Sequence, residues 1–561
     1  MRRRLTTMVP LVFALLATAA ARAEPPAMPA GDDPALRALV EQRFGGDRTG
    51  ACVAVAVIAD DVRTAHVCAD PAEQARIEGD VAFEIGSVSK TMTAALLARW
   101  IAAGEASLDE PLSAWLPGTK VPEFEGQPIL LRHVVTHTSG LPALPAGVPI
   151  PDPANPYAAM DVDGLLKAIE HAALTRAPGT TMEYSNFASM LLSIAVARRA
   201  GMPFDALMRE ELFTPLGMRT AHIGAPPAGV RAAVGHLPNR QPTSPWDFAA
   251  DAAGVGGVRA TLADMVAYVQ AHLGQRPSAL DPALALTREP VPTASGRPMA
   301  MNWMLGRLPG GTLHAHEGGT GGFSSFVGFD VAAGRGVVVL SDTALTSVGG
   351  LASLALHLVD PELPLGQPRK PATPPTELLD ALAGRWRLSA GLAATIRHDG
   401  SRMFIHPDGQ PEFELGYDSA GDFHPLAFDA VLRPVRQPGG GWGFQWQQGG
   451  AVMPAERVDP AAANGSAGGI AADAAPTVAE LQAYAGEYPL APQFALTVFE
   501  RDGRLFIQGT GQQAIPAEPA ARDVFVVPQV GAEFRFERDG DGRVTAVTLL
   551  QGGQAMRGER R

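Results

Sequence analysis

Two breaks in composition divide this chain into parts of different character. The first, residues 361–375, is rich in proline, and the second, residues 459–476, is rich in alanine and glycine. Both compositions are typical of linkers between separately folded units. The chain has 561 residues, which also indicates more than one domain. We expect a large domain at 24–362, a linker at 363–375, a smaller domain at 376–458, a linker at 459–476 and a last domain at 477–561.

The two segments that follow the breaks resemble one another. Residues 383–386 (AGRW) correspond to residues 485–488 (AGEY), an offset of 102 positions, and each is followed by an Asp-Gly pair, at 399–400 and 502–503. Asp-Gly between β-rich runs is a strong hairpin signal. We therefore predict two copies of a small antiparallel β-domain, each a closed barrel or a meander.

The large domain has strand-like runs at both of its ends. They lie at 51–58 and 62–67 near its beginning and at 326–329 and 336–340 near its end. Helical stretches lie between these pairs of runs, at 87–103, 187–199, 204–212 and 261–272. This order predicts an α/β domain in which one antiparallel sheet joins the two ends of the segment.

The first residues have the form of a secretory signal peptide. Three arginines at 2–4 precede a short apolar run at 11–20, and Ala21-Arg22-Ala23 is an A-x-A cleavage site. The alternative is an uncleaved membrane anchor, but the run is short for a span, and no later run is long enough either. We expect a signal peptide at 1–23, an exported protein that is periplasmic or secreted, and no stable membrane insertion after cleavage.

The charge excludes some partners. The formal charge is -13, and loss of the four signal-peptide arginines would make it -17. Nucleic acids and anionic lipid surfaces are bound by clustered positive charge, so we expect neither as a partner. The sequence carries no signal for an oligomeric state.

The two cysteines of the chain, Cys52 and Cys68, flank a pair of apolar runs joined by a polar turn at 59–61. If these runs form a hairpin centred on Asp60, the two cysteines face each other across it. In an oxidising compartment we predict a disulfide; the alternative is two buried free thiols. Without a C-x-x-C pair or a Cys/His cluster, we predict no metal site.

The pair Ser87 and Lys90 carries the strongest chemical signal. The chain has only four lysines, and Lys90 follows Ser87 by three residues, just past Gly86. A lysine amine can lose its proton in a dry site, whereas arginine stays charged. If a helix begins near Ser87, the two side chains share one face, and a buried amine can accept the serine proton. The alternative is a chance spacing on a helix surface.

The stretch at 83–93 (FEIGSVSKTMT) resembles the active-site motif of class C β-lactamases and the wider serine β-lactamase-like hydrolases, which include penicillin-binding proteins, D-aminopeptidases and related esterases. The resemblance covers residues 35–345, with further matching stretches at 108–112, 136–142 and 215–218. It implies an α/β (α+β) β-lactamase-like catalytic domain with an antiparallel sheet and a helical insert. More loosely, the two β-domains resemble the lipocalin-like barrel modules appended to D-aminopeptidase.

The resemblance implies roles for two further motifs, which follow in the family's order. In Tyr184-Ser185-Asn186, the tyrosine relays the proton between nucleophile and leaving group, and the asparagine contacts the substrate amide. Whether Lys90 or Tyr184 is the general base stays open. In His316-Glu317-Gly318, histidine and glycine occupy the substrate-binding positions where the family usually has Lys-Thr-Gly.

The resemblance further implies that the backbone N–H groups of Ser87 and Gly319 form the oxyanion hole. Two other histidines are less informative. His137 could be catalytic, although a structural role in a turn is the simpler interpretation, and we interpret His314 as a strand residue. Glu317 is left out of the catalytic set because its family position varies.

The histidine at 316 bears on the substrate, a small molecule or peptide. Lysine there would offer a fixed charge to a carboxylate, whereas histidine, with an ordinary pKa of about 6.5, is mostly neutral at pH 7. We therefore expect a Ser-Lys-Tyr acyl-enzyme hydrolase of amides or esters, D-amino-acid peptidase or esterase-like, without a cofactor. The alternatives are a β-lactamase or D-Ala-D-Ala carboxypeptidase, and a non-catalytic receptor for penicillins or cell-wall fragments. The β-domains either bind glycan or protein, or cover the cleft and limit substrate size, which we favour.

Overall fold

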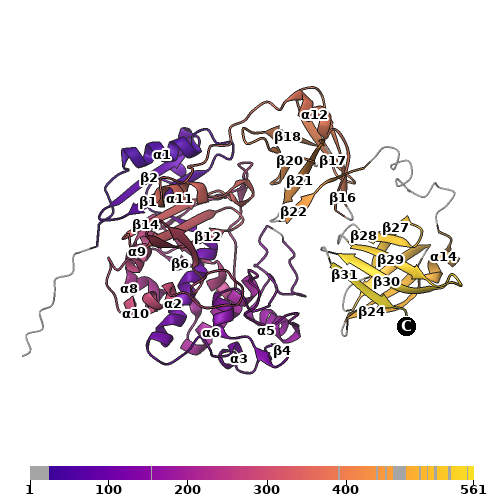
Figure 1. Ribbon diagram of the computed structural model, residues 1–561, viewed down its shortest axis with the longest axis horizontal. Helices are drawn as coiled ribbons and strands as arrows, with labels where there is room; N and C mark the ends of the chain where they lie inside the picture. The colour runs from indigo at the N-terminus through magenta and orange to yellow at the C-terminus, as the bar shows by residue number, and fades with distance from the viewer. Residues whose placement is uncertain are drawn as a thin grey trace, which may run out of the picture.

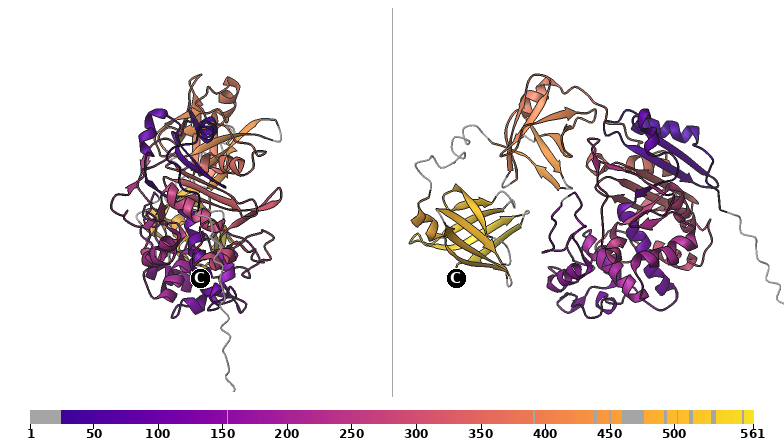
Figure 2. Two further views of the ribbon diagram at one scale, coloured as in Figure 1. Left: turned by 90° about the vertical axis from the view of Figure 1, so that its left-hand side faces the viewer. Right: turned by 180° about the vertical axis from the view of Figure 1, so that it is seen from behind.

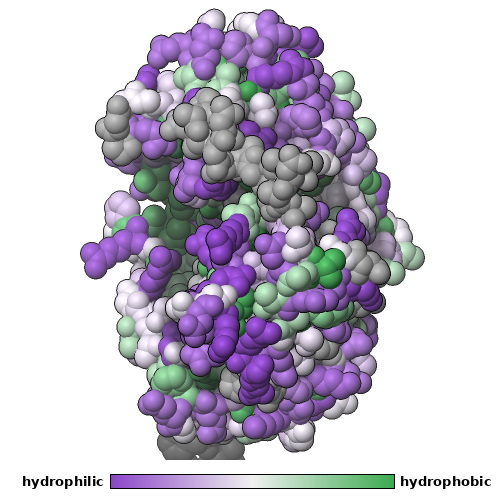
Figure 3. Space-filling view, turned by 90° about the vertical axis from the view of Figure 1, so that its right-hand side faces the viewer, coloured by the Kyte–Doolittle hydropathy of each residue, from purple (hydrophilic) through white to green (hydrophobic). Residues whose placement is uncertain are grey.

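The computed structural model describes residues 25–561 except 153, 390–391, 438–439, 449–450, 459–475, 492–493, 502, 511–513, 528–531 and 552–553. The expected signal peptide at 1–23 and nearly all of the expected linker at 459–476 lie outside these residues. Within them, no helix has the length and hydropathy needed to cross a membrane. The face shown in Figure 3 is hydrophilic over most of its area, with hydrophobic residues in small groups.

One six-stranded antiparallel sheet joins the two ends of the first domain, as the sequence predicted. The strands run in the order β11-β12-β13-β14-β1-β2. Val53 on β1 pairs with Val67 on β2 and with Ser341 on β14, so β1 lies between its hairpin partner and the end of the domain. The strands are β1 Cys52–Ile58, β2 Val62–Cys68, β11 Met304–Leu308, β12 Gly311–Gly319, β13 Ser324–Asp330 and β14 Arg335–Ser341.

Both faces of this sheet are covered (Figure 1). Along β1, Ala54 and Ala56 belong to the core on the side of the helical insert, whereas Val53 and Val55 belong to the core on the other side. A strand buried on both faces reads as a continuous apolar run, which is the pattern of β1. The second core is closed by α1 (Pro34–Phe44) and α11 (Ala352–Val359).

The helical insert surrounds α2 (Ser89–Ala102), which follows the 3-10 turn η2 at Gly86–Val88. Every residue of α2 from Ser89 to Ala98 is buried. The remaining helices of the domain are α3 Leu112–Trp115, α4 Leu131–Val135, α5 Val162–His171, α6 Asn186–Ala200, α7 Phe204–Met208, α8 Thr214–Leu216, α9 Leu262–His272 and α10 Asp281–Arg288. Its short strands are β3 Val81–Glu84, β4 Glu123–Phe124, β5 Gln127–Pro128, β6 His222–Ile223, β7 Arg231–Ala232, β8 Gly235–His236, β9 Pro242–Thr243 and β10 Val258–Ala260.

The predicted helix at 204–212 is not a single α-helix. It is α-helical only to Met208, continues as a π-helical turn at Arg209–Phe213 and ends in α8. Pro215 lacks the N–H that would close a regular α-helical turn, and a widened turn just before it is consistent with that missing donor.

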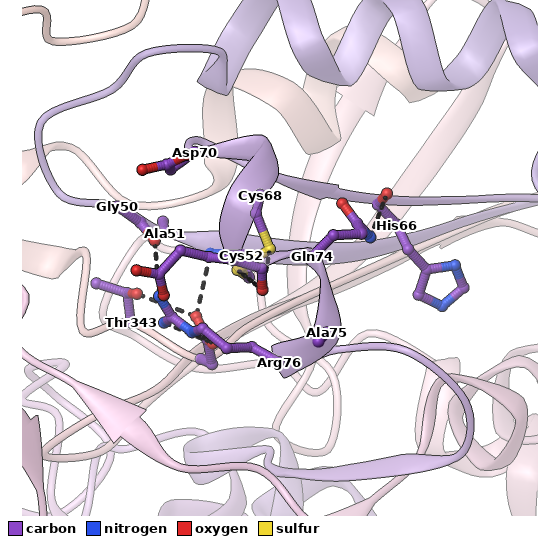
Figure 4. Close-up of a disulfide and its surroundings, with 12 residues drawn as sticks. Gly50, Ala51, Cys52, His66, Cys68, Asp70, Gln74, Ala75, Arg76 and Thr343 are labelled. Atoms are coloured by element: carbon purple, nitrogen blue, oxygen red, sulfur yellow. Dashed lines mark hydrogen bonds and ion pairs between the residues drawn. A yellow bond between two sulfur atoms is a disulfide. The ribbon is translucent and has the colours of Figure 1, made fainter.

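The Cys52–Cys68 pair forms a disulfide in the structure (Figure 4), with 3.9 Å between the two Cα atoms. The two residues are direct partners in the β1–β2 hairpin. Beside them, Arg76 donates from Nε to Asp342 at 2.9 Å and from Nη1 to the Gly50 carbonyl at 3.1 Å. The bridge therefore lies at the end of a hairpin that is also held by side-chain hydrogen bonds.

The first β-domain is a nearly closed barrel. Its strands are adjacent in chain order, and β23, two residues after β22, pairs with β15 at the opposite edge of the sheet. Helix α12 (Thr376–Leu382) packs on it. The strands are β15 Gly384–Ser389, β16 Leu392–His398, β17 Met403–Pro407, β18 Phe413–Tyr417, β19 Phe423–Pro425, β20 Val431–Arg436, β21 Trp442–Gln448, β22 Ala451–Pro454 and β23 Glu456–Arg457.

The second β-domain repeats this plan (Figure 2). Helix α14 (Val478–Ala483) precedes eight strands in chain order, and the N–H of Arg561 donates to the Glu487 carbonyl at 2.9 Å, which joins the last residue to the first strand. The strands are β24 Gly486–Ala491, β25 Phe494–Arg501, β26 Arg504–Gly509, β27 Ile515–Ala521, β28 Val524–Val527, β29 Ala532–Arg538, β30 Val544–Gln551 and β31 Gln554–Glu559.

Equivalent hydrogen bonds support the internal repeat. Trp386 donates from its indole to the carbonyl of Leu382, four residues back, at 2.8 Å. In the second copy, the hydroxyl of Tyr488 donates to the carbonyl of Tyr484 at 2.7 Å. Trp386 and Tyr488 are both buried at the offset found in the sequence, so each fixes its preceding helix to the barrel in the same way.

The segment at 363–375, expected as a linker, is bound along its length to the first domain and the first β-domain. Arg48 donates from its backbone N–H to the Arg369 carbonyl at 2.8 Å, and its Nε lies 2.7 Å from Oδ2 of Asp418. Arg369 lies 3.1 Å from Asp418 and 2.8 Å from Asp422. These charges are nearly excluded from solvent, so they fix the first β-domain on the α/β domain.

Candidate active site

Ser87 lies where β3 ends and the turn leads into α2. Gly86 has φ +50°, a left-handed conformation that glycine adopts without strain. Among residues 81–90, only the Ser87 side chain is not fully buried. The sharp turn therefore presents one hydroxyl to solvent on an otherwise buried segment.

Lys90 lies one helical turn further along and is 1% exposed. Its Nζ lies 2.8 Å from Oγ of Ser87 and 2.7 Å from the carbonyl oxygen of Val255. Burial lowers the pKa of Lys90 well below its ordinary value, because a dry environment disfavours the ammonium form. A neutral amine in this position can accept the proton of the Ser87 hydroxyl.

Tyr184 comes from the segment just before α6. The next residue, Ser185, caps that helix by accepting from the N–H of Ala188 at 3.0 Å. Lys90 Nζ lies 5.0 Å from the centroid of the Tyr184 ring. Burial raises the pKa of Tyr184 above its ordinary value, and the interaction of its hydroxyl with Ser87 offsets only part of this rise. The phenol is therefore protonated when the amine is neutral.

Asn186 is the first residue of α6. Its Nδ2 donates to the hydroxyl of Tyr157 at 2.8 Å. Its Oδ1 is buried and has no hydrogen-bond partner among the described residues. An unpartnered buried acceptor is unfavourable, and a substrate N–H would satisfy it.

His316 lies on β12 and is 2% exposed. Burial, followed by the neighbouring Lys90, lowers the pKa of His316 to about 3. Its Nδ1 lies 2.6 Å from the Glu317 carbonyl oxygen and must donate to it, so the neutral ring carries its proton on Nδ1. Nε2 is then an acceptor, and it has no partner among the described residues.

Glycines bring the turn at Gly86–Val88 and β12 together. A Cβ added at Gly86 would lie 2.6 Å from the backbone nitrogen of Gly319, and one added at Gly318 would lie 2.0 Å from the Ile85 carbonyl oxygen. Both contacts are impossible for a side chain. Gly318 thus has a steric reason to be glycine, and the backbones of Ser87 and Gly319 are brought to one side of the site.

His314, two residues before His316 on the same strand, bonds through Nε2 to the Arg288 carbonyl and stacks on Phe329. It is a structural strand residue, as the sequence indicated.

Three further groups in the site have a weaker sequence signal than the motifs that contain Ser87, Lys90 and Tyr184. The Val255 carbonyl and Tyr157 belong to no motif. His137 stacks on Tyr184 with 4.1 Å between ring centroids; its sequence context pointed to a turn and not to this contact.

Two family models match the chain. Residues 36–358 match the model described as Beta-lactamase. Residues 471–560 match a model described as a domain of unknown function, DUF3471.

Curated relatives match parts of the chain. The D-alanyl-D-alanine-carboxypeptidase/endopeptidase AmpH of Escherichia coli (strain K12) is 33% identical over 205 residues, which are 36% of this chain and 52% of AmpH. Esterase EstB of Burkholderia gladioli is 28% identical over an alignment of 380 residues that covers 57% of this chain and 92% of EstB. The chain thus spans about half the length of AmpH.

Among solved structures, D-alanine carboxypeptidase AmpC from Burkholderia cenocepacia has 24% sequence identity and a TM-score of 0.48, with 58% of this chain and 98% of that chain covered.

Proposed function

Because the chain belongs to the Beta-lactamase family and is a serine hydrolase, we propose that it cleaves an amide or ester through an acyl-enzyme on Ser87. The observation that carries this proposal is the 2.8 Å contact between Ser87 Oγ and the buried Lys90 amine, next to the protonated Tyr184. Nucleophile, base and proton relay are thus within reach of one carbonyl carbon.

We assign the general base to Lys90. The Ser87 Oγ proton passes to the neutral amine while Oγ attacks the substrate carbonyl carbon. The N–H groups of Ser87 and Gly319 would stabilise the negative oxygen, each donor contributing about 3 kcal/mol. The raised pKa of Tyr184 argues against a phenolate base and suits a relay that passes the proton from Lys90 to the leaving group. Water then cleaves the acyl-enzyme by the reverse path and regenerates Ser87.

For the substrate, we propose a D-amino-acid peptide or a neutral ester. A neutral His316 with a free Nε2 acceptor attracts a carboxylate less than lysine would and suits an N–H or O–H donor. The unpartnered Oδ1 of Asn186 likewise suits a substrate amide N–H. The names of AmpH, a peptidase, and EstB, an esterase, support this range.

We propose that the first β-domain covers one rim of the site and limits substrate size. Asp429 of this domain lies 3.4 Å from Ser347, next to Thr346, whose hydroxyl lies 3.4 Å from the Cβ position of Gly319. A carboxylate of the first β-domain therefore contacts Ser347, and the adjacent Thr346 lies next to Gly319, whose N–H is proposed as an oxyanion donor. We further propose that the chain is exported after cleavage at Ala23, and that its site needs no cofactor.

The test is initial hydrolysis rates of the mature protein against a Ser87→Ala control. The panel contains a chromogenic cephalosporin, p-nitrophenyl acetate and butyrate, and the p-nitroanilides of D- and L-alanine. Turnover that depends on Ser87 supports the acyl-enzyme, and the best substrate identifies the branch. A kcat/KM above about 10⁵ M⁻¹s⁻¹ on the cephalosporin would favour the β-lactamase alternative, and no Ser87-dependent turnover would favour the receptor alternative.

A further inference from the structure

His137 has an unusual backbone conformation. It follows α4 with φ +54°, in the left-handed region that few residues other than glycine adopt. The residue is fully buried, and its carbonyl accepts from the N–H of Glu183 at 2.8 Å. Backbone strain of this kind persists only where the surroundings enforce it, and it concentrates at functional sites.

The side chain of His137 is neutral and directed at the catalytic segment. Its ring stacks on Tyr184, with 4.1 Å between centroids and 30° between planes. Its Nδ1 accepts from the N–H of Ser185 at 3.3 Å, so the proton of the neutral ring is on Nε2, which has no partner among the described residues. Burial first, then Lys90 and His316, lowers the pKa of His137 well below its ordinary value.

We propose that His137 is a positioning residue for the reaction: its neutral ring packs behind Tyr184, holds the phenol against Ser87 and keeps water away from Lys90. The inference rests on the proposed roles of Ser87, Lys90 and Tyr184. It goes beyond them because His137 acts through Tyr184 and touches no substrate.

The charge state of Lys90 depends on this packing. The groups around its amine are the Ser87 hydroxyl, the Val255 carbonyl, the Tyr184 ring, and the neutral imidazoles of His137 and His316. Burial alone lowers the Lys90 pKa, so an opening behind Tyr184 that admits water must raise it. A cationic group in place of His137 would instead repel the ammonium form.

Two substitutions at His137 test its aromatic ring and its Nδ1 acceptor separately. His137→Asn keeps an acceptor near the Nδ1 position and tolerates a positive φ, but it removes the stacked ring. His137→Phe keeps a ring and removes the acceptor. His272→Asn is the matched control, because His272 is equally buried and stacks on Phe329, with 4.9 Å between centroids.

The readouts are kcat and KM on p-nitrophenyl butyrate, the acid limb of kcat/KM against pH, and the melting temperature. For His137→Asn we expect kcat to fall about 10- to 100-fold at nearly constant KM, which is below the roughly 10²- to 10⁴-fold that a general acid or base itself contributes, and we expect the acid limb to move to higher pH. His137→Phe and His272→Asn should lower the melting temperature and leave the limb in place. The proposal would be overturned if His137→Asn kept the wild-type kcat and the wild-type acid limb. It would also be overturned if the acid limb moved as far in His137→Phe as in His137→Asn.

A second readout does not depend on turnover. The chain has four lysines, so a spectrum labelled with ¹⁵N at lysine Nζ contains few signals, and the Lys90 signal is the one absent in Lys90→Met. The proposal requires that the Lys90 pKa rise in folded His137→Asn and stay unchanged in His272→Asn. If the wild type turns over no member of the substrate panel, the proposed function fails, while this titration still decides the role of His137.

Discussion

The backbones of Gly86 and Gly319 are in direct contact. A Cβ on Gly86 would lie 2.6 Å from the nitrogen of Gly319 and 2.8 Å from its carbonyl oxygen. This contact joins the turn at Gly86–Val88 to β12, two elements that are far apart in the sequence. It sets the distance between the two N–H groups proposed as the oxyanion hole, so the site depends on residues without side chains as much as on those with them.

The first prediction concerns Gly318→Ala. The added methyl would lie 2.0 Å from the Ile85 carbonyl oxygen and 2.3 Å from the Ser325 hydroxyl, so β12 must move away from the turn. We expect a loss of about 10²- to 10³-fold in kcat, as for removal of one oxyanion donor. Gly306→Ala on β11 of the same sheet is the control, because its nearest atom would be at 3.5 Å. Wild-type turnover in Gly318→Ala would contradict the proposal that the N–H groups of Ser87 and Gly319 form the oxyanion hole.

Lys90→Met should stabilise the protein while it abolishes turnover. The pKa of Lys90 is lowered in the folded state, so between the folded and unfolded pKa values the unfolded chain binds more protons, and stability rises with pH. Each unit of lowering corresponds to about 1.4 kcal/mol at lower pH. Urea unfolding at several pH values would show this slope in the wild type and a smaller one in Lys90→Met. Equal slopes would mean that Lys90 is charged when folded.

His316→Lys should change substrate preference. With a pKa of about 3, the wild-type imidazole stays neutral and should produce no transition in kcat/KM between about pH 5 and 8. A lysine would introduce the charge that suits a carboxylate, so we expect the ratio of cephalosporin to p-nitrophenyl butyrate turnover to rise about tenfold or more, equivalent to about 1.4 kcal/mol. His314→Gln on the same strand is the control and should keep the wild-type ratio. An unchanged ratio in His316→Lys would argue that position 316 does not meet the acyl donor.

Arg48→Ala should loosen the first β-domain. Asp418 is fully buried, and Arg369 remains as its second partner in the variant, so we expect a loss of stability below the about 3–5 kcal/mol that is typical when a buried charge is left without any partner. We expect faster tryptic cleavage after Arg369, since the bond after Lys370 precedes Pro371 and resists trypsin, and a rise in turnover of large substrates relative to small ones. Arg433→Ala is the control, since Arg433 contacts Asp422 within the barrel. If residues 363–375 stay protected from trypsin in Arg48→Ala and the preference for small over large substrates is unchanged, the proposal that the first β-domain covers the site is contradicted.

Removal of the disulfide should affect stability and leave catalysis unchanged. In Cys52→Ala/Cys68→Ala, the loss of a loop of about 15 residues should cost roughly 3 kcal/mol, measurable as a lower melting temperature. β1 lies three strands away from β12, so kcat on the best substrate should stay at the wild-type value. A large loss of kcat at a temperature where the variant is folded would show that the hairpin influences the site.

The sequence predicted most of the fold, because its signals are local. The apolar runs gave the β1–β2 hairpin with Cys52 opposite Cys68, and the Asp-Gly turns and the repeat gave two β-domains. The motifs named Ser87, Lys90 and Tyr184, whose side chains the structure brings together.

What the sequence could not provide are contacts between distant segments. The Val255 carbonyl under Lys90, the Tyr157 hydroxyl on Asn186 and the pairing of Arg48 with Asp418 each join residues whose types are common and whose spacing carries no pattern. Proline content predicts a linker at 363–375, but it does not reveal that Arg369 binds to both the first domain and the first β-domain.

The position of β1 in the central sheet also determines the order in which the chain can fold. The hairpin with β2 is local and can form as soon as residue 68 is available. The other edge of β1 must wait for Ser341, and such long-range pairing is slow to form. Until then an apolar strand edge is open to pairing with other chains. A fragment that ends before β14 should therefore aggregate more readily than the full chain.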